Sequence, residues 1–291
     1  MPDFIHILEH SFIESLKLIP FLFLTYLLME YLEHHSSDMA ERILKRSGQF
    51  GSLIGSSLGL LPQCGFSSAA AGLYSARVIS LGTLIAVFLS TSDEMLPIFL
   101  SSTQIGFDII FKTLLIKFII ALLSGFLIDL AIKTIYKRKT IFLESKIEEF
   151  CEREDCHCHH SIFKPALIHT LKIGAFIFAF TLALNLIIHG IGEEPIKEFI
   201  RSNHFLANIL SAFVGLIPNC ASSVIICELY IDSNGIFTAG MMISGLLANS
   251  GIALAVLFRT NRPRRDNFII VLILFVIAVL SGLLIDVLPI F

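Results

Sequence analysis

The stretch Gly59-Leu60-Leu61-Pro62-Gln63-Cys64 returns 156 positions later as Gly215-Leu216-Ile217-Pro218-Asn219-Cys220. Each copy lies inside a run without charged residues, residues 48–76 and 205–227. A proline inside a helix lacks the backbone N–H and frees the carbonyl four residues earlier, here at Leu58 and Val214. The sequence therefore predicts two apolar runs, each broken at its proline, with backbone oxygens that need a polar partner.

The composition indicates a membrane protein. Only 15% of the 291 residues are charged, 55% are hydrophobic, and the mean hydropathy is +0.82. Soluble domains carry about 25% charged residues, so this chain has too little polar surface to coat a globule and we expect lipid around it. The net charge of −3 and the lack of a basic stripe argue against a nucleic-acid partner. The start, Met-Pro-Asp-Phe-Ile-His, lacks the basic residues of a signal peptide, so we expect a mature chain.

Further runs approach the roughly 20 residues that a membrane-spanning helix needs. The uncharged or nearly uncharged ones are Ile173–Ile191, Ile236–Phe258 and Phe268–Ile290. Those with charged residues inside are Phe12–Tyr31, Val78–Leu100 and Asp108–Tyr136. The pieces on either side of each proline are shorter, which predicts half-helices that re-enter or cross as broken spans. The expected fold class is therefore an all-α polytopic integral membrane protein.

The similarity between the two parts of the chain extends well beyond the proline motifs. Ser124-Gly125-Phe126-Leu127-Ile128-Asp129 matches Ser281-Gly282-Leu283-Leu284-Ile285-Asp286 at an offset of 157. Ser90-Thr91-Ser92 faces Ala248-Asn249-Ser250 at an offset of 158. This register predicts two homologous transmembrane repeats, residues 1–140 and 161–291, joined by a Cys/His-rich linker at residues 141–160.

The basic residues favour an inverted relationship between the repeats. If each proline run crosses once, the repeats are parallel and the basic residues divide almost evenly, against the positive-inside rule. If each run returns or crosses twice, nearly all are cytoplasmic and only Lys197 and Arg201 of the connecting segments lie outside. We therefore expect inverted-topology repeats in the plasma (inner) membrane, with a cytoplasmic linker, both termini outside, and a site at the repeat interface near the midplane.

Amides, thiols and hydroxyls flank each proline, and inversion would bring the two sets together. The candidate substrate-binding residues are Gln63, Cys64, Ser67 and Ser68 in the first half, and Asn219, Cys220, Ser222 and Ser223 in the second. The alternative is that the prolines kink packed helices and that Ser and Cys are merely small. The duplication of the whole motif weakens that alternative.

Asp93 and Glu94 lie deep inside Val78–Leu100, where an unpaired charge costs at least about 2.5–3.5 kcal/mol. Such a cost implies a partner, which is a substrate cation, a proton or Lys117. The alternative is a span that ends at Ser92 and leaves the pair in water. Asn249 is the neutral counterpart in the second half. Carboxylates favour a cationic cargo, and thiols beside carboxylate and amide oxygens are ligands that transition metals accept.

The candidate metal ligands fall into two groups. The membrane group consists of Cys64, Cys220, Asp93 and Glu94. The linker group consists of Cys151, Cys156, His157, Cys158, His159 and His160. In a reducing compartment such a cluster binds metal more readily than it forms disulfides, and its spacing suits transient capture or sensing better than a zinc finger. The alternative is a solvated polar loop.

Other motifs give weaker evidence about function. Gly55-Ser56-Ser57-Leu58-Gly59 fits a hydrolase elbow pattern but lacks the preceding strand, and Gly51, Gly55 and Gly59 are better read as a helix-packing face. Asp129 and Asp286 are expected to anchor or cap helix ends. No nucleotide-binding or H-E-x-x-H motif occurs, so we expect neither an enzyme nor a resident cofactor.

These motifs resemble a family of ten-transmembrane heavy-metal exporters, whose members are called arsenic efflux proteins or manganese transporters. The resemblance covers nearly the whole chain. It rests on Leu61–Gly65, Ser90–Glu94, the Cys/His linker and Ile217–Ser223. It implies export of a metal or metalloid, and ten spans imply that both pieces of each proline run cross or nearly cross.

The resulting hypothesis is a proton-coupled secondary transporter that exports a transition-metal cation such as Mn²⁺, or arsenite. Cys64 and Cys220 would bind the cargo, Gln63 and Asn219 would coordinate or orient it, and Asp93 with Glu94 would exchange protons for it. The alternatives are a transporter of small organic anions, a metal-sensing membrane protein without flux, and a membrane enzyme. Expected partners are lipid, the metal or metalloid and the proton; the oligomeric state, a homodimer included, stays open.

Overall fold

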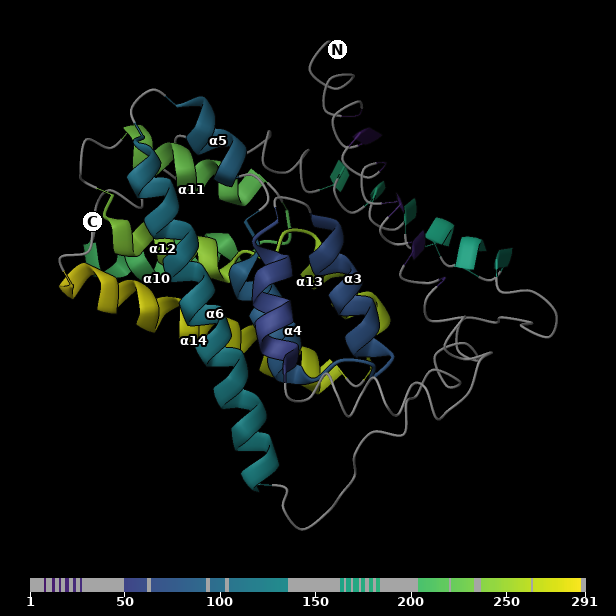
Figure 1. The fold of residues 1–291 in the computed structure, drawn as a ribbon. Coiled ribbons are helices and arrows are strands. Elements are labelled where there is room, and N and C mark those ends of the chain that lie inside the picture. The colour runs from purple at the N-terminus through teal and green to yellow at the C-terminus, as the bar shows by residue number, and fades with distance from the viewer. Residues whose placement is uncertain are drawn as a thin grey trace.

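The computed structural model describes residues 50–61, 64–92, 95–102, 105–135, 204–219, 221–232, 237–262 and 264–288, and single positions within residues 8–27 and 163–183. Every regular element in this part of the chain is a helix (Figure 1). Residues 50–59 are helical. The labelled helices are α3 (Cys64–Ser75), α4 (Leu81–Ser90), α5 (Met95–Ser101), α6 (Phe107–Ile135), α10 (His204–Gly215), α11 (Ala221–Asp232), α12 (Ala239–Ala248), α13 (Ala253–Thr260) and α14 (Arg264–Val287).

Three of the described stretches are long and apolar enough to cross a membrane, which agrees with the predicted all-α membrane fold. Phe107–Thr134 and Arg264–Val287 bury only a minor part of their surface in the protein. Ala239–Thr260, which comprises α12 and α13, is almost entirely buried. The outer helices α6 and α14 thus present apolar faces to lipid, whereas α12 and α13 form the centre of the fold.

Both proline runs are broken, as predicted, but the turns satisfy the freed carbonyls themselves. In the first run, residues 50–59 and α3 flank the break; in the second, α10 and α11 do. The backbone N–H of Leu61 donates to the Leu58 carbonyl at 3.1 Å, and that of Ile217 donates to the Val214 carbonyl at 3.1 Å. The polar partner that these oxygens were expected to need is therefore a nearby backbone N–H, because a tighter i→i+3 turn replaces the lost helical bond.

Two runs that the sequence predicts as continuous spans are also broken. Ile236–Phe258 divides into α12 and α13 around residues 249–252, and Val78–Leu100 divides into α4 and α5 around residues 91–94. Side chains at the breaks bond to nearby backbone: Thr91 Oγ1 donates to the Val87 carbonyl at 2.8 Å, and Asn249 Oδ1 accepts from the Gly251 N–H at 2.7 Å. Hydropathy alone does not register such competition with the helical ladder.

The helices that precede these breaks, α4 and α12, begin in the same way in both halves. Ser80 and Thr238 are the N-caps of α4 and α12, with φ/ψ of −74°/164° and −74°/163°. Asp129 Oδ1 on α6 accepts from the Gly82 N–H at 2.9 Å, and Asp286 Oδ1 on α14 accepts from the Gly240 N–H at 2.9 Å. Both aspartates are caps, but the helix end was predicted wrongly: each caps the start of the neighbouring helix and not the end of its own.

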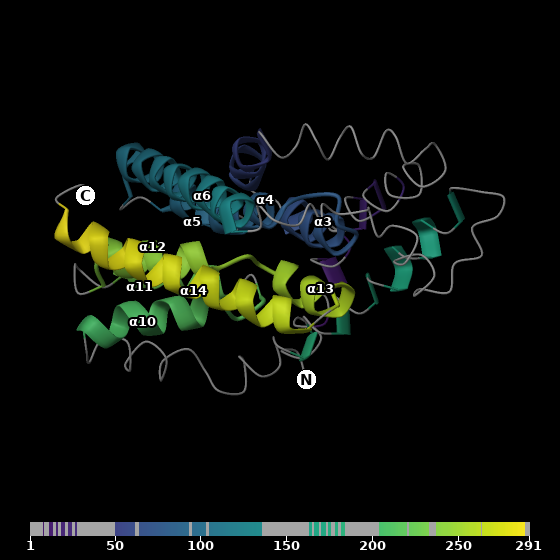
Figure 2. The ribbon, with the colours of Figure 1, turned by 90° about the horizontal axis from the view of Figure 1, so that it is seen from below.

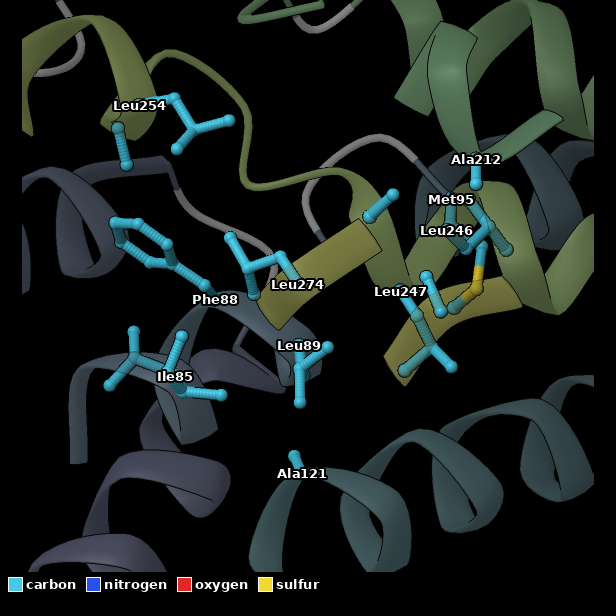
Figure 3. Packing of buried hydrophobic residues seen from close by; sticks show 14 of the residues in the cluster. Ile85, Phe88, Leu89, Met95, Ala121, Ala212, Leu246, Leu247, Leu254 and Leu274 are labelled. Atoms are coloured by element: carbon cyan, nitrogen blue, oxygen red, sulfur yellow. The ribbon is translucent and has the colours of Figure 1, made fainter. Parts of the chain in front are cut away.

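The helices of the two halves of the sequence pack against each other. Within each half, α4 packs on α6 and α12 packs on α14; across the halves, α3 contacts α13 and α11 contacts α5 (Figure 2). The predicted packing role of Gly51, Gly55 and Gly59 is confirmed, because a Cβ at each would meet α4 closely, at Thr83, Val87 or Ser90. Apolar side chains of both halves fill the centre, among them Phe88 and Leu89 of α4 and Leu246 and Leu247 of α12 (Figure 3).

Candidate functional site

A buried lysine on α6 joins the two breaks that hydropathy did not reveal. Lys117 is 0% exposed. Its Nζ donates to the Thr91 carbonyl, which lies just past the end of α4. It also donates, at 3.1 Å, to the Leu246 carbonyl in the last turn of α12. Lys117 therefore ties the end of a helix in the first half to the end of the equivalent helix in the second.

The electrostatics of this contact favour a positive charge. The last carbonyls of a helix have no intrahelical partner and carry about half a negative charge between them. Two such ends, those of α4 and α12, supply the oxygens that Lys117 contacts. A charged side chain in a spanning helix costs about 2.5–3.5 kcal/mol on insertion scales, and these oxygens offset part of that cost.

The second break is built from polar residues with little solvent contact. Asn249 and Ser250 are 6% and 1% exposed, and Gly251 adopts a φ of +57°, which favours glycine. Ser250 Oγ is buried without a hydrogen-bond partner, and so is Ser68 Oγ in α3. An unpaired buried hydroxyl costs free energy unless a ligand or water forms a hydrogen bond with it. These two oxygens are therefore available to a bound ligand.

Ser68 and the Asn249 break lie at the same end of a helix pair. Ser75 Oγ, in the last residue of α3, is 2.7 Å from Thr260 Oγ1, in the last residue of α13. Since the C-terminal ends meet and the helices contact each other, α3 and α13 run in the same direction. Their N-terminal ends, which follow Pro62 and the Asn249 break, therefore face the same side of the protein.

The equivalent pair, in which α11 replaces α3 and α5 replaces α13, is arranged alike. The ring centroids of Phe99 and Tyr230 are 6.2 Å apart. Phe99 lies near the end of α5 and Tyr230 near the end of α11. These helices contact each other as well, so they too run in the same direction. The Pro218-Asn219-Cys220 turn precedes α11 and the Asp93-Glu94 segment precedes α5. The helix after each proline motif, α3 or α11, thus lies beside the helix after the break in the other half, α13 or α5.

All predicted site residues whose side chains are described are buried. They are Ser67, Ser68, Asn219, Ser222, Ser223 and Asn249, each at most 6% exposed. The Pro218 turn is closed locally: the Asn219 N–H donates to the Ile217 carbonyl at 2.7 Å, and Ser222 Oγ donates to the Asn219 carbonyl at 2.6 Å. Ser222 therefore ties the start of α11 to the Pro218 turn, in addition to any role in binding.

The other predicted ligands lie outside the described residues. They are Gln63, Asp93, Glu94 and Cys220, the side chain of Cys64, and the linker residues Cys151, Cys156, His157, Cys158, His159 and His160. Among the side chains that are described, no group of three His, Cys, Asp or Glu gathers in a way that could hold a metal. The metal assignments of both groups therefore stay predictions.

Sequence reasoning named Lys117 as a partner for carboxylates and missed its carbonyl partners. It also missed Thr91, Leu246 and Ser250. The available signal was the repeat itself: Thr91 faces Asn249 at an offset of 158, so a break at one position implies one at the other. Leu246 gave no signal, because its contribution is a backbone oxygen.

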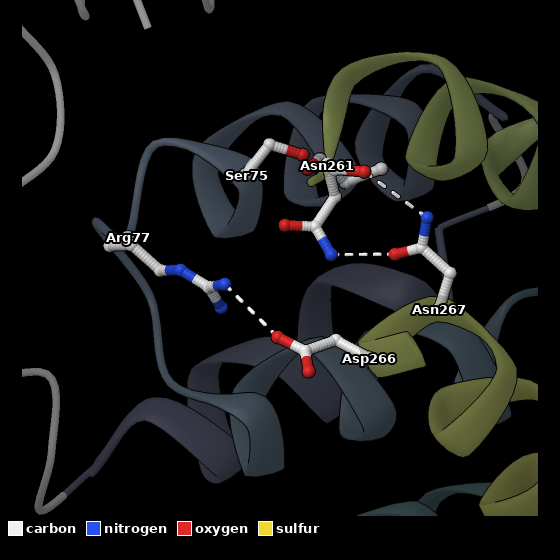
Figure 4. A network of polar contacts seen from close by, with 6 residues as sticks. Ser75, Arg77, Asn261, Asp266 and Asn267 are labelled. Atoms are coloured by element: carbon white, nitrogen blue, oxygen red, sulfur yellow. Dashed lines mark hydrogen bonds and ion pairs between the residues drawn. The ribbon is translucent and has the colours of Figure 1, made fainter. Parts of the chain in front are cut away.

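A polar network joins the C-terminal ends of α3 and α13, away from the breaks, to the start of α14 (Figure 4). Arg77, just after α3, forms an ion pair of 3.2 Å with Asp266 of α14. Beside it, Asn261 Nδ2 donates to Asn267 Oδ1 at 2.5 Å, and Asn267 Nδ2 donates back to the Asn261 carbonyl at 3.2 Å. The segment between α3 and α4 and the segment after α13 are thereby both fixed to the first turn of α14.

Comparison with known families covers almost the whole chain. Residues 3–193 and 168–289 match one family of membrane transporters in two segments. No curated protein and no solved structure matches the chain. The chain has membrane-length apolar helices, broken helices at its centre and a buried lysine between them. Because the match covers almost the whole chain, the protein belongs to the family described as "Putative, 10TM heavy-metal exporter".

Proposed function

We propose that this protein is a secondary transporter that exports a transition-metal cation such as Mn²⁺, or arsenite, from the cytoplasm in exchange for protons. The single observation that carries the proposal is the bridge from Lys117 to the carbonyls of Thr91 and Leu246. It places a cation-attracting group of oxygens at the meeting point of two broken helices, which is where secondary transporters bind their cargo.

Contacts between loops support the inverted arrangement of the repeats. In a parallel arrangement the segment after α3 and the segment before α14 lie on opposite sides of the membrane. In the inverted arrangement both are cytoplasmic. Arg77 belongs to the first of these segments and Asp266 to the first turn of α14, directly after the second, and their side chains are 3.2 Å apart. We accordingly propose a plasma-membrane protein with the linker in the cytoplasm and both termini outside.

The charge at the centre favours a cation over a small organic anion. The ends of α4 and α12 present carbonyl oxygens, and an anion would be repelled by them. Asp93 and Glu94 lie two and three residues after Thr91 in the chain. Carboxylates at that point would add two negative charges. In this proposal these carboxylates exchange protons for cargo, while Cys64 and Cys220 supply thiolate ligands for the softer metals.

Flux measurements in vesicles test the proposal. The full-length protein is reconstituted, and the movement of Mn²⁺, Zn²⁺, Co²⁺ and arsenite is followed with and without an imposed pH gradient. Saturable flux of one of these that responds to the gradient is the expected result. Absence of flux for all four, together with binding of a metal, would overturn the proposal in favour of a metal sensor; uptake of organic anions that is insensitive to chelators would favour the anion transporter.

Two substitutions test the site itself. Asp93→Asn and Cys64→Ser are each expected to lower metal flux at least tenfold. Matched controls are Asp108→Asn, which changes an exposed carboxylate at the start of α6, and Cys227→Ala, which changes a buried thiol within α11 away from the breaks. The controls should transport like the unaltered protein. Unchanged flux in both site variants would exclude these residues as the cargo site.

A linker variant separates capture from transport. Replacement of Cys156, Cys158 and His157, His159 and His160 by serine removes most of the linker ligands. If the linker only captures metal, flux should fall at low metal concentration and recover at saturation. Loss of flux at every concentration would instead make the linker part of the transport path.

A further inference from the structure

The two halves of the protein provide an internal comparison for Lys117. The buried positions of α6 include Thr113, Lys117, Ala121 and Gly125, and those of α14 at an offset of 157 include Ile270, Leu274, Ala278 and Gly282. Lys117 and Leu274 are both 0% exposed. A leucine therefore fills the same place in the second half. The shared framework needs a side chain of this size here, but it does not need an ammonium group.

The surroundings of the ammonium are those of a cation site. Its contacts include backbone carbonyl oxygens from two separate helix ends, at Thr91 and Leu246. Carbonyl oxygens at broken helices are also the groups with which transporters coordinate cations. Hard and borderline metal ions accept the same oxygens. The lysine thus holds a position that a metal ion could hold.

We propose that Lys117 is a built-in cation of the transport site, which occupies the meeting point of α4 and α12 while cargo is absent and competes with the cargo cation for it. The inference rests on the proposed export of a metal cation. The competition would keep the affinity for cargo low enough for release, and it would keep the two helix ends joined when the site is empty. A site without such a competitor would hold its cargo more tightly and turn over more slowly.

An anion receptor is the other reading of a buried lysine. A receptor lysine would direct its ammonium toward an open site with positive surroundings, such as the N-terminal ends of helices. Lys117 instead donates to carbonyls near the C-terminal ends of α4 and α12. An anion placed at Nζ would lie against those carbonyl oxygens, so the geometry favours competition with a cation.

The experiment compares Lys117→Leu and Lys117→Met with Leu274→Met, a change of similar size at the equivalent buried position. The full-length variants are purified in detergent, and binding of Mn²⁺, Zn²⁺ and Co²⁺ is measured by equilibrium dialysis and by the rise of the thermal unfolding midpoint. The same variants are reconstituted for flux. Lys117→Leu and Lys117→Met should bind the cargo metal at least tenfold more tightly and show a lower maximal flux, whereas Leu274→Met should match the unaltered protein.

Lys117→Arg guards against a simple folding defect, because it keeps the charge while changing the shape. It should retain the weaker binding of the unaltered protein. If the unaltered protein transports a metal but Lys117→Leu and Lys117→Met bind that metal equally well or more weakly, the inference is overturned and the proposed function stands. If the unaltered protein transports none of the three metals or arsenite, the proposed function itself fails.

Discussion

The Asp129 carboxylate accepts a hydrogen bond of 2.9 Å from the backbone N–H of Gly82. Asp129 also accepts from Ser80 Oγ at 2.7 Å, so a side chain near the end of α6 closes the start of α4. Asp286 repeats the first contact with Gly240 in the second half, at 2.9 Å. Because unpaired helix N–H groups are costly inside a membrane, this pair of contacts fixes where the central helices begin.

Loss of either carboxylate should destabilise the protein. Hydrogen bonds to a charged group contribute about 1.5–3 kcal/mol each, so Asp129→Ala and Asp286→Ala should both lower the thermal unfolding midpoint in detergent. Lys133→Ala, an exposed change one turn further along α6, serves as the control and should leave it unchanged. An unaltered midpoint in both aspartate variants would contradict the capping role.

The glycines at the same contact should tolerate no side chain. A Cβ at Gly82 would collide with the Gly125 carbonyl oxygen and lie 2.6 Å from Asp129 Oδ1. Gly240 meets Gly282 and Asp286 in the same way. Because backbone is the obstacle, Gly82→Ala and Gly240→Ala should cost at least about 1–3 kcal/mol and reduce the yield of monodisperse protein. Gly174→Ala, whose nearest neighbour would be Ile19 Cγ1 at 3.8 Å, should express normally.

Arg77 should be replaceable by glycine more easily than by alanine. It follows α3 with a φ of +60°, and the Val78 N–H closes the helix end on the Leu73 carbonyl at 2.8 Å. Glycine is the usual residue at such a position, and a side chain there costs about 1–2 kcal/mol. Because the ion pair with Asp266 is partly exposed, we expect it to contribute no more than about 1 kcal/mol to the free energy of unfolding.

Unfolding midpoints of Arg77→Gly and Arg77→Ala separate these contributions. Arg77→Ala loses the ion pair and the stacking of the guanidinium over the Tyr74 ring, 4.9 Å from its centroid, without relief of the backbone. Its midpoint should fall. Arg77→Gly loses the same contacts but relaxes the backbone, so its midpoint should stay near that of the unaltered protein. Equal losses in both variants would show that φ at this position carries no cost.

The break between α12 and α13 should depend on Gly251. Its φ of +57° disfavours alanine by about 1–2 kcal/mol, so Gly251→Ala should lower both the unfolding midpoint and the flux of the cargo metal. Gly251→Asn should retain more of each, since asparagine adopts this conformation at lower cost. Identical behaviour of the two variants would argue that the backbone here is not held by the surrounding structure.

Much of the site could be anticipated because the chain contains its own copy. The duplicated Pro-x-Cys motifs, the paired aspartates and the buried Ser67, Ser68, Asn219, Ser222, Ser223 and Asn249 all follow from residue type and offset. The break after Ser90 lies close to Ser92, where the alternative reading ended that span, whereas the break after Ala248 could not be read from a run that is apolar enough to form a continuous span. Hydroxyl and amide side chains that bond to nearby backbone interrupt both runs, and hydropathy does not count such bonds.

The sequence by itself determined the membrane environment, the duplication and the breaks at Pro62 and Pro218, since these depend on composition and on a missing backbone donor, which are local properties. Only the tertiary structure decided that α3 lies beside α13, that α11 lies beside α5, and that Lys117 meets the carbonyls of Thr91 and Leu246. Those partners are far apart in the chain. Every residue has a backbone carbonyl, so residue type does not indicate which carbonyl will bind Lys117. They become distinct only when packing brings two particular helix ends to one ammonium group.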